Sequence, residues 1–168
     1  MRKIDISKLT QKYKVRGMTE SDIGLIYDLC LGNGQYYEYC AKQPSTELIK
    51  DDLTVTPPGK STSDKYYVGF FDREKLIAVL DLIDGYPEDG IAFIGFFMLA
   101  KERQGQGLGS LMVTEICDYL KSVGFTKVRL GIDKDNPQSN HFWKKNGFAV
   151  LKEVVKDDGV LLLAEKTL

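Results

Sequence analysis

The first third of the chain has apolar residues at the spacing of helices. In residues 18–31 they recur every three or four positions behind a Thr/Glu/Ser/Asp start, which predicts an amphipathic helix with a capped N-terminus. Gly32 and Gly34 are expected to end this helix. A second helix is predicted in 44–53 (PSTELIKDDL), and the stretch 56–64 has the Pro, Gly and Ser content of a loop.

From residue 65 onward the pattern is that of β-strands. Residues 65–71 and 75–83 are rich in β-branched and aromatic side chains and are separated by a short turn. The next run, IAFIGFFML at 91–99, is apolar at successive positions, which predicts a strand inside a sheet that is covered on both faces. Gly95 in its middle indicates a bulge or a close approach to the backbone. A short first strand is expected at 13–16.

The second half of the chain alternates helices and strands. The stretch 108–125 predicts an amphipathic helix, 127–132 (KVRLGI) a strand, and 136–148 (NPQSNHFWKKNGF) a short helix. Residues 148–155 and 159–167 are expected to form a closing hairpin. With strands in runs, helices interspersed, and no repeat or linker, the order predicts one α+β unit.

Length and composition are those of one compact globular domain over residues 1–168. Hydrophobic residues make up 43% and charged residues 28%, which excludes a disordered chain. Lys plus Arg number 23 and Asp plus Glu 24, so neither nucleic acid nor a membrane is expected as a partner, since both favour a basic surplus. The N-terminal residues lack the apolar core of a signal peptide. The apolar run 91–100 is about half of a membrane-spanning helix.

The cysteines and the histidine form no metal-binding pattern. Cys30, Cys40 and Cys117 lie far apart, and His141 has no cysteine near it. We therefore expect free thiols in a reducing cytoplasm and no bound metal. His141 is expected at the surface or behind a site, because it would lie on the outer part of a short helix.

The sequence RQGQGLGSLM (103–112) places Gly105, Gly107 and Gly109 at alternate positions directly before a helix. The first amides of a helix lack intrahelical partners and favour anions, and glycines allow phosphate oxygens to reach them. No lysine follows Gly109, so the stretch is not a P-loop, and its last two glycines are too close for a dinucleotide fingerprint. A glycine-rich turn without a ligand is the alternative, although a plain turn seldom needs this pattern.

The pattern Q-x-x-G-x-G from Gln104 to Gly109 resembles that of the GNAT superfamily of acyl-CoA-dependent N-acyltransferases. The resemblance includes the strand before the pattern, the helix after it and the helix–turn 136–148. It implies a cofactor half at about 66–150 and acceptor-side helices at about 20–55. The acceptor-side helices resemble the family only in their helix–helix layout. The implied fold is a single-domain α+β, GNAT-like fold: a mixed, mostly antiparallel central sheet with helices on both faces.

The resemblance also implies acetyl-CoA as the acyl donor. Its pyrophosphate would lie on the amides of the glycine loop, and its pantetheine arm would bond main-chain groups at the end of strand 91–99. In the family an asparagine after the next strand faces the arm. The implied donor-binding residues are Met98, Leu99, Gln104, Gly105, Gln106, Gly107, Leu108, Gly109, Ser110, Asn136 and Ser139.

The expected chemistry is direct attack of an amine on a thioester, for which positioning supplies much of the rate. Many family members place a tyrosine acid on the helix after the asparagine. This chain has Trp143 there, and an indole N–H donates no proton at neutral pH. The acid is therefore absent or supplied by another tyrosine, and Trp143 is expected to pack over the cofactor arm or in the core.

Strand 91–99 offers no glutamate as a general base. The nearest carboxylates are Asp81 and Asp84, which point to opposite faces of the neighbouring strand. Asp81 lies inside an apolar strand and needs a partner. It is a candidate base or amine anchor, or the acceptor of a structural hydrogen bond. Tyr86 is a further candidate catalytic residue.

Tyr36, Tyr37 and Glu38 follow the first helix, where the family builds its acceptor pocket. They could enclose a cationic amine, although core packing explains them equally well. The implied function is an N-acetyltransferase that moves an acetyl group from acetyl-CoA to a primary amine of a small molecule or protein, as a monomer or homodimer. The alternative is a non-catalytic acyl-CoA-binding sensor or scaffold, which the missing tyrosine leaves open.

Overall fold

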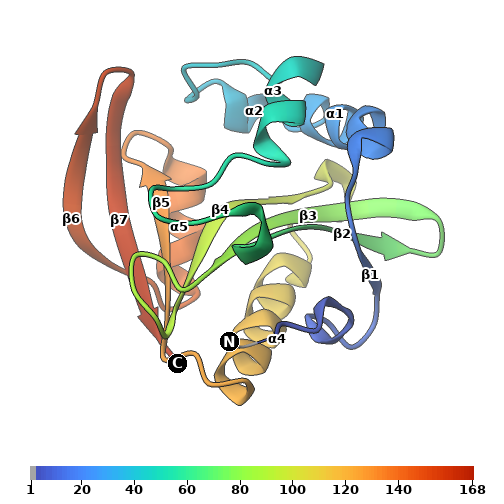
Figure 1. Ribbon diagram of the computed structural model, residues 1–168. Coiled ribbons are helices and arrows are strands. Elements are labelled where there is room, and N and C mark those ends of the chain that lie inside the picture. Colours follow the sequence, from blue (N-terminus) through green and yellow to red (C-terminus); the bar gives the residue numbers. More distant parts are fainter. Residues whose placement is uncertain (1–2) are drawn as a thin grey trace.

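The computed structural model describes residues 3–168 and is built on one mixed sheet of seven strands in the order β1-β2-β3-β4-β5-β7-β6 (Figure 1). Neighbouring strands are antiparallel except β4 and β5, which run parallel. The strands are β1 (Lys14–Gly17), β2 (Lys65–Asp72), β3 (Lys75–Asp84), β4 (Ile91–Leu99), β5 (Lys127–Asp133), β6 (Ala149–Lys156) and β7 (Gly159–Thr167).

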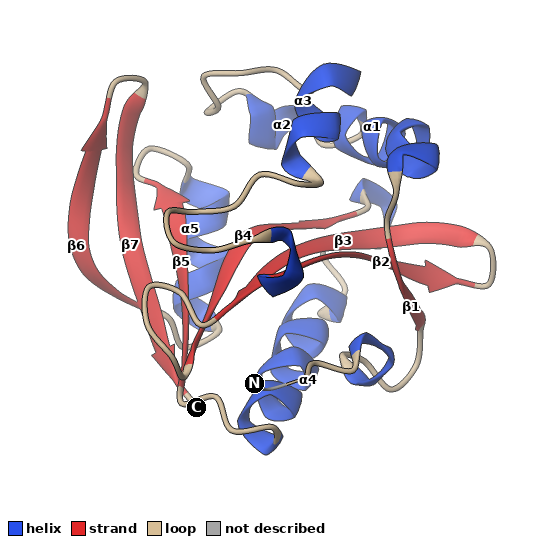
Figure 2. Cartoon of the chain, in the orientation of Figure 1, coloured by secondary structure: helices blue, strands red, loops and turns tan. Residues whose placement is uncertain are grey.

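Helices cover both faces of the sheet (Figure 2). One cluster of buried side chains joins α4 and α5 to the sheet, and a second cluster joins α1, α2 and α3 to its other face. The fold therefore confirms the predicted α+β class with a mixed, mostly antiparallel sheet and helices on both faces. The helices are α1 (Ile23–Leu31), α2 (Gly34–Tyr37), α3 (Thr46–Asp52), α4 (Leu108–Ser122) and α5 (Pro137–Lys145).

The structure corrects the expectation for one glycine. Gly32 ends α1 as predicted, but Gly34 begins the short helix α2 instead of ending α1. A helix of four residues is too short for a periodic apolar pattern to reveal it. The start of α3 follows the prediction closely, because the Ser45 hydroxyl accepts a hydrogen bond from the Leu48 amide at 3.1 Å and caps the helix.

A bulge in β4 lies at the point in the middle of the sheet where β4 stops pairing with β5. Ile94 pairs with Leu82 and Phe96 with Asp81, so Gly95 is the extra residue between them, at the position predicted for a bulge. On its other side β4 pairs with β5 only over Ile91–Ile94. Beyond that point the two strands diverge (Figure 1).

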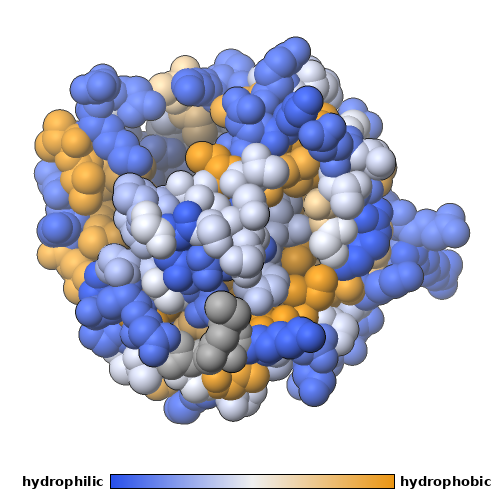
Figure 3. Space-filling model, in the orientation of Figure 1, coloured by the Kyte–Doolittle hydropathy of each residue, from blue (hydrophilic) through white to orange (hydrophobic). Residues whose placement is uncertain are grey.

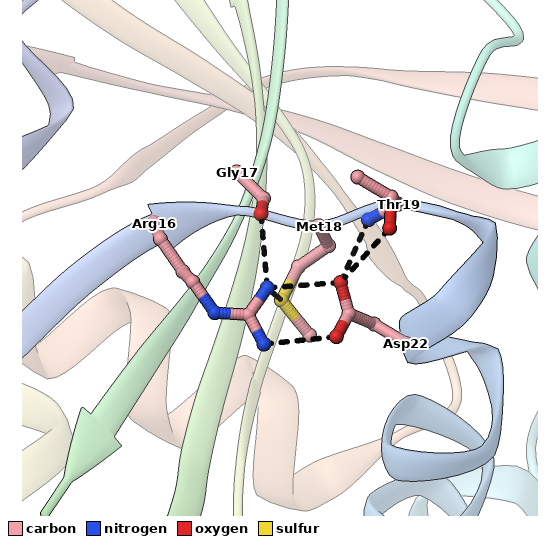
Figure 4. A network of polar contacts seen from close by, with 5 residues as sticks. All are labelled: Arg16, Gly17, Met18, Thr19 and Asp22. Carbon is pink, nitrogen blue, oxygen red and sulfur yellow. Dashed lines mark hydrogen bonds and ion pairs between the residues drawn. The ribbon is translucent and has the colours of Figure 1, made fainter. Parts of the chain in front are cut away.

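The start of α1 is tied to the edge strand β1 by a polar network (Figure 4). The Arg16 guanidinium on β1 donates two hydrogen bonds of 2.9 Å to the Asp22 carboxylate just before α1, and Asp22 also accepts one from the Thr19 amide at 2.9 Å. The bonds from Arg16 lower the pKa of Asp22 to about 2. The first turn of the helical region is therefore fixed to the first strand.

Three features of the described residues concern membrane spans, metal binding and the state of the cysteines. Within residues 3–168, no helix combines the length and apolar character that crossing a membrane requires. The same part of the chain holds no group of three or more His, Cys, Asp and Glu side chains arranged for a metal ion. Cys30, Cys40 and Cys117 are free thiols.

Candidate functional site

A cavity of about 440 Å³ opens where β4 and β5 diverge. We call it the cleft. Its walls come from the second half of β4, the end of β5, the glycine loop before α4, and one side of α5. Four segments that follow one another in the sequence between residues 94 and 145 thus converge on one space.

The three alternate glycines of the loop have two different structural reasons. Gly105 and Gly107 have φ of 78° and 80°, the left-handed region in which residues with a side chain are strained. Gly109 is needed for close packing, because a Cβ there would lie 3.1 Å from the Phe142 ring of α5. No atom lies within 4 Å of the Cβ positions at Gly105 and Gly107. The loop therefore presents open backbone to the cleft.

The amides at the start of α4 are not used by the protein itself. Gly107 is the N-cap and supplies no side-chain cap, and the first helical bond runs from the Leu111 amide to the Gly107 carbonyl at 3.1 Å. Among the described residues, the N–H groups of 106–110 find no acceptor. A 15-residue helix also places the positive end of its dipole here. Together these groups form an anion-binding site.

Gln104 holds the end of β4 in place. Its side-chain amide donates hydrogen bonds to the Leu99 carbonyl at 2.8 Å and to Asn33 Oδ1 at 2.6 Å. Asn33 is buried and also donates to the Leu99 carbonyl, at 3.2 Å. Gln104 therefore fixes the loop to the strand, and the Leu99 carbonyl is already satisfied. Asn33 has no sequence signal that would have revealed this role.

Backbone alternation decides which groups of β4 face the cleft. The Ala100 amide donates to Ile77 of β3 at 2.7 Å, so Ala100 and Met98 direct their main-chain groups toward β3, whereas Leu99 and Phe97 direct theirs away from it. The main-chain groups on the cleft side thus belong to Phe97 and Leu99. Leu99 was predicted from the sequence, whereas Phe97 was not, and the main-chain groups of the predicted Met98 face β3. The apolar pattern of the strand does not establish its phase.

Residues of α5 form the opposite wall of the cleft. Ser139, His141 and Lys145 line it, with His141 exposed. Asn136 caps α5 through Oδ1, which accepts from the Ser139 amide at 3.1 Å, and its Nδ2 is buried without a partner among the described residues. Lys145 adds a positive charge to this wall. Nothing in its sequence context distinguishes it from its neighbour Lys144.

Aromatic side chains make the apolar part of the cleft. Trp143 is buried and packs edge-on against Phe142 and Phe148, with ring centroids 4.9 and 5.2 Å apart. Its ring centroid also lies 6.0 Å from that of Phe97, and Trp143 lines the cleft. Trp143 therefore lies both in the core and on the cleft wall, the two locations that the sequence analysis considered.

Asp81 is held in a buried ion pair. The Lys65 ammonium lies 2.7 Å from both of its carboxylate oxygens, and the two side chains are 3% and 13% exposed. The carboxylate fills the space over the bulge, where a Cβ on Gly95 would meet Asp81 Oδ2 at 2.7 Å. Burial raises the pKa of Asp81 despite Lys65. This arrangement matches the structural role considered for Asp81, with a lysine partner that the sequence did not suggest.

Tyr86 lies away from the cleft. It follows β3 in the turn before β4, packs edge-on against Phe93 at 5.3 Å, and lines a different, shallow cavity with Lys60 and Asp64. The cleft forms at the opposite end of β4. The structure therefore does not bring Tyr86 to the candidate site.

A second cavity, of about 320 Å³, adjoins the cleft on the side of α2 and α3. We call it the aromatic pocket. Tyr36, Tyr37, Tyr67 and Phe96 supply its rings, and it shares Tyr36, Phe96 and Asp133 with the cleft. Glu38 is exposed and is not among the described residues that line it. The predicted Tyr36 and Tyr37 thus meet Tyr67 and Asp133, which come from distant strands.

Comparisons with known proteins agree with this geometry. The model of the acetyltransferase (GNAT) family matches residues 33–148. Comparison with curated protein sequences gives no match. Among solved structures, an acetyltransferase from Thermus thermophilus has a TM-score of 0.75 at 19% identity and covers 94% of this chain and 98% of its own.

Two further structures have the same fold. The PaiA N-acetyltransferase from Thermoplasma acidophilum, solved in complex with coenzyme A, has a TM-score of 0.68 at 18% identity, with 94% of this chain and 100% of its own covered. An acetyltransferase from Salmonella typhimurium that modifies the N-terminal serine of the 50S ribosomal protein L7/L12 has a TM-score of 0.71 at 16% identity, with 95% and 97% covered. At these identities the likeness shows a shared fold.

Proposed function

Because the chain belongs to the acetyltransferase (GNAT) family, we propose that it transfers the acetyl group of acetyl-CoA to a primary amine of a small molecule or a protein. The observation that carries this proposal is the row of unpaired amides at residues 106–110. Such amides at a helix N-terminus bind phosphate oxygens. The open space at Gly105 and Gly107 leaves them accessible to a diphosphate.

The fit to acetyl-CoA extends along the cleft. We assign the diphosphate to the amides of 106–110 with Lys145 beside them, and the pantetheine arm to the main-chain groups of Phe97 and Leu99. Ser139 lines the same wall. Asn136 is not among the described residues that line the cleft, and its buried Nδ2 has no partner among them; its role in this proposal is to cap α5, which carries Ser139.

Acetyl-CoA supplies an activated acyl thioester. The residues of the chain hold this thioester in the apolar end of the cleft, and the Phe97 amide can stabilise negative charge on the carbonyl oxygen. Trp143 supplies no proton. Tyr36 is the tyrosine that lines both cavities, and burial raises its pKa, so it stays a neutral hydroxyl. Asp81 and Tyr86 have no part in this proposal, since neither lines either cavity.

We further propose that residues of about 66–150 hold the donor and helices of about 20–55 shape the acceptor site, within one domain. The coenzyme A complex of the PaiA enzyme and the serine acceptor of the Salmonella enzyme support a donor and an amine of these kinds. Every assigned residue comes from one chain, so the proposal holds for a monomer or a homodimer. The free thiols support a reducing compartment such as the cytoplasm.

The test combines binding with turnover. Coenzyme A at about a hundred times its Kd should add about 2.7 kcal/mol to the stability of the folded protein, seen as a rise in Tm that ATP and NAD do not cause. With acetyl-CoA and a panel of amines, release of free thiol should depend on the amine. A rise in Tm without thiol release from any amine would instead favour a sensor or scaffold.

A further inference from the structure

The aromatic pocket carries more negative charge than its own residues neutralise. Asp52, Asp133 and Asp158 line it, and Lys42 is the one lysine among its described lining residues. None of the three carboxylates forms an ion pair with a described residue. Asp52 and Asp133 are half-buried and Asp158 is exposed, whereas the Asp22 and Asp81 side chains, 9% and 13% exposed, are paired with Arg16 and Lys65. A cavity whose walls carry more carboxylates than cations is complementary to a cationic ligand.

The three carboxylates come from different parts of the fold. Asp52 is the last residue of α3, Asp133 ends β5, and Asp158 lies in the turn between β6 and β7. Figure 1 shows the tip of that hairpin and the helices α2 and α3 on the same side of the molecule, and the space-filling view shows a recess between them (Figure 3). The charges therefore lie on separate walls of one cavity, and not on one patch.

Asp133 has a special position because it lines both the aromatic pocket and the cleft. A molecule in the pocket would face the cleft past this carboxylate, with Tyr36 and Phe96 beside it. Asp52 lines the pocket but is not among the described residues that line the cleft. Asp133 thus marks the end of the aromatic pocket near the proposed thioester site, and Asp52 marks the end away from it.

We propose that the aromatic pocket binds a short aliphatic primary amine that carries a second positive charge, with its reacting nitrogen at Asp133 and its distal ammonium at Asp52 and Asp158. This inference rests on the proposed acetyl transfer. The rings of Tyr36, Tyr37, Tyr67 and Phe96 enclose the methylene chain and attract the ammonium groups. Burial raises the pKa values of the three tyrosines, so they remain neutral and add no charge of their own.

Asp133 also acts as the general base. Its carboxylate accepts one proton from the ammonium, the freed amine forms a bond to the acyl carbon, and the carbon–sulfur bond breaks as the thiolate of coenzyme A leaves. The nitrogen then loses its second proton to the departing thiolate, which leaves as the thiol of coenzyme A, and Asp133 passes the first proton to solvent. The ammonium has thus lost two protons and gained one acetyl group. A carboxylate must be ionised to do this.

The surroundings of Asp133 give this step a recognisable pH dependence. Burial raises the pKa of Asp133, the thiol of Cys40 at 3.9 Å lowers it by a hydrogen bond, Asp158 and Asp135 raise it, and Lys156 lowers it. The net direction is upward from the ordinary value of 3.8. The rate should therefore fall on acidification at a pH above that value, as Asp133 becomes protonated.

Binding tests the second charge independently of turnover. With coenzyme A present, calorimetry should give 1,4-diaminobutane a Kd at least about tenfold lower than that of butylamine, a difference of about 1.4 kcal/mol. Asp52→Asn should remove most of this preference by weakening the diamine alone. The control is Asp51→Asn, its exposed neighbour on α3, which should keep the preference.

Kinetics tests Asp133. Asp133→Asn should lower kcat for both amines by about a hundredfold or more, abolish the acidic limb of the pH profile and leave the coenzyme A-induced rise in Tm unchanged. Equal Kd values for the two amines, or equal loss of both in Asp52→Asn, would overturn the second charge. An unchanged pH profile in Asp133→Asn would overturn the base. Absence of any coenzyme A effect on Tm in the wild-type protein would instead refute the proposed function.

Discussion

The cleft and the aromatic pocket are built in opposite ways. The cleft presents main chain to its ligand: the amides of 106–110 and the strand groups of Phe97 and Leu99. The aromatic pocket presents side chains from three helices, the loop between α2 and α3, three strands and a hairpin turn. Binding groups of the main chain remain when a substitution changes the side chain at the same position. Binding groups of side chains, as in the pocket, are changed one at a time by single substitutions. We infer that the cleft fixes the donor and that the pocket sets the acceptor.

The largest effect is expected at the buried ion pair beside Gly95, a residue of the cleft wall. Lys65→Met leaves the Asp81 carboxylate buried and unpaired under Gly95, and should reduce the free energy of unfolding by about 3–5 kcal/mol. The double variant Lys65→Met/Asp81→Leu should recover most of that loss. Urea unfolding at pH 7 measures both. If the folded double variant binds coenzyme A but no longer transfers acetyl groups, Asp81 belongs to the acceptor chemistry and the structural role is wrong.

The backbone character of the cleft can be broken at Gly107. Gly107→Val forces a β-branched residue to φ near 80° and should raise the Kd for coenzyme A by about a hundredfold, or about 2.7 kcal/mol. Gly59→Val is the matched control, since Gly59 has φ of 81°, equally open space and no place in the cleft. Both variants carry similar strain, of about 1–3 kcal/mol. Equal loss of binding in both would mean that strain, and not the loop, controls affinity.

The stability of the helical region on the acceptor side should depend on the ionised carboxylate of Asp22. The pKa of Asp22 is lowered from 3.8 to about 2, so the ion pair with Arg16 contributes fully above pH 3.8 and is lost as the pH falls through about 2. The shift corresponds to about 2 kcal/mol of stability. The stability difference between wild type and Asp22→Asn should therefore be present at pH 6 and shrink toward pH 2. A difference that does not change with pH would show that charge is not involved.

The smallest effect is expected at Trp143. Trp143→Phe keeps an aromatic ring against Phe142 and Phe148, so the Kd for coenzyme A and kcat should change by less than about threefold, below the 1.4 kcal/mol of a tenfold change. Trp143→Ala should instead cost about 3–5 kcal/mol of stability. A collapse of kcat in Trp143→Phe with normal binding would give the indole a role in the reaction.

The same contrast explains what the sequence could predict. The elements of the cleft follow one another along the chain, so strand, glycine loop and helix were predicted together, and the bulge at Gly95 was among them. Of the residues that line the pocket, only Tyr36 and Tyr37 were predicted from the sequence to lie at the acceptor site. Asp52 and Asp133 carry no local signal, because what makes them notable is that folding brings them to one cavity, where neither forms an ion pair with a described residue.

Strand phase and ion pairing also escaped prediction. Choosing between Met98 and Phe97 for the main-chain groups on the cleft side required the bond between Ala100 and Ile77. The role of Asp81 required its partner Lys65, which is sixteen residues away in sequence but directly bonded in space. Both are facts of pairing between strands, and an apolar pattern within one strand does not contain them.

The divergence of β4 and β5 has a consequence for solubility. Unpaired strand edges usually attract other polypeptides and promote aggregation. Here two such edges face each other in the interior of the sheet, with helices on either side. The cavity between them, of about 440 Å³, is lined by side chains and main chain of the protein itself. The outer edge strand β6 has eight residues and carries Lys152, Glu153 and Lys156 beside the exposed Val150, Leu151 and Val155. Charges on an edge strand discourage sheet-to-sheet growth. If the proposed donor binds as inferred above, the interior edges would pair with a small linear molecule, whereas the outer edge of β6 faces solvent.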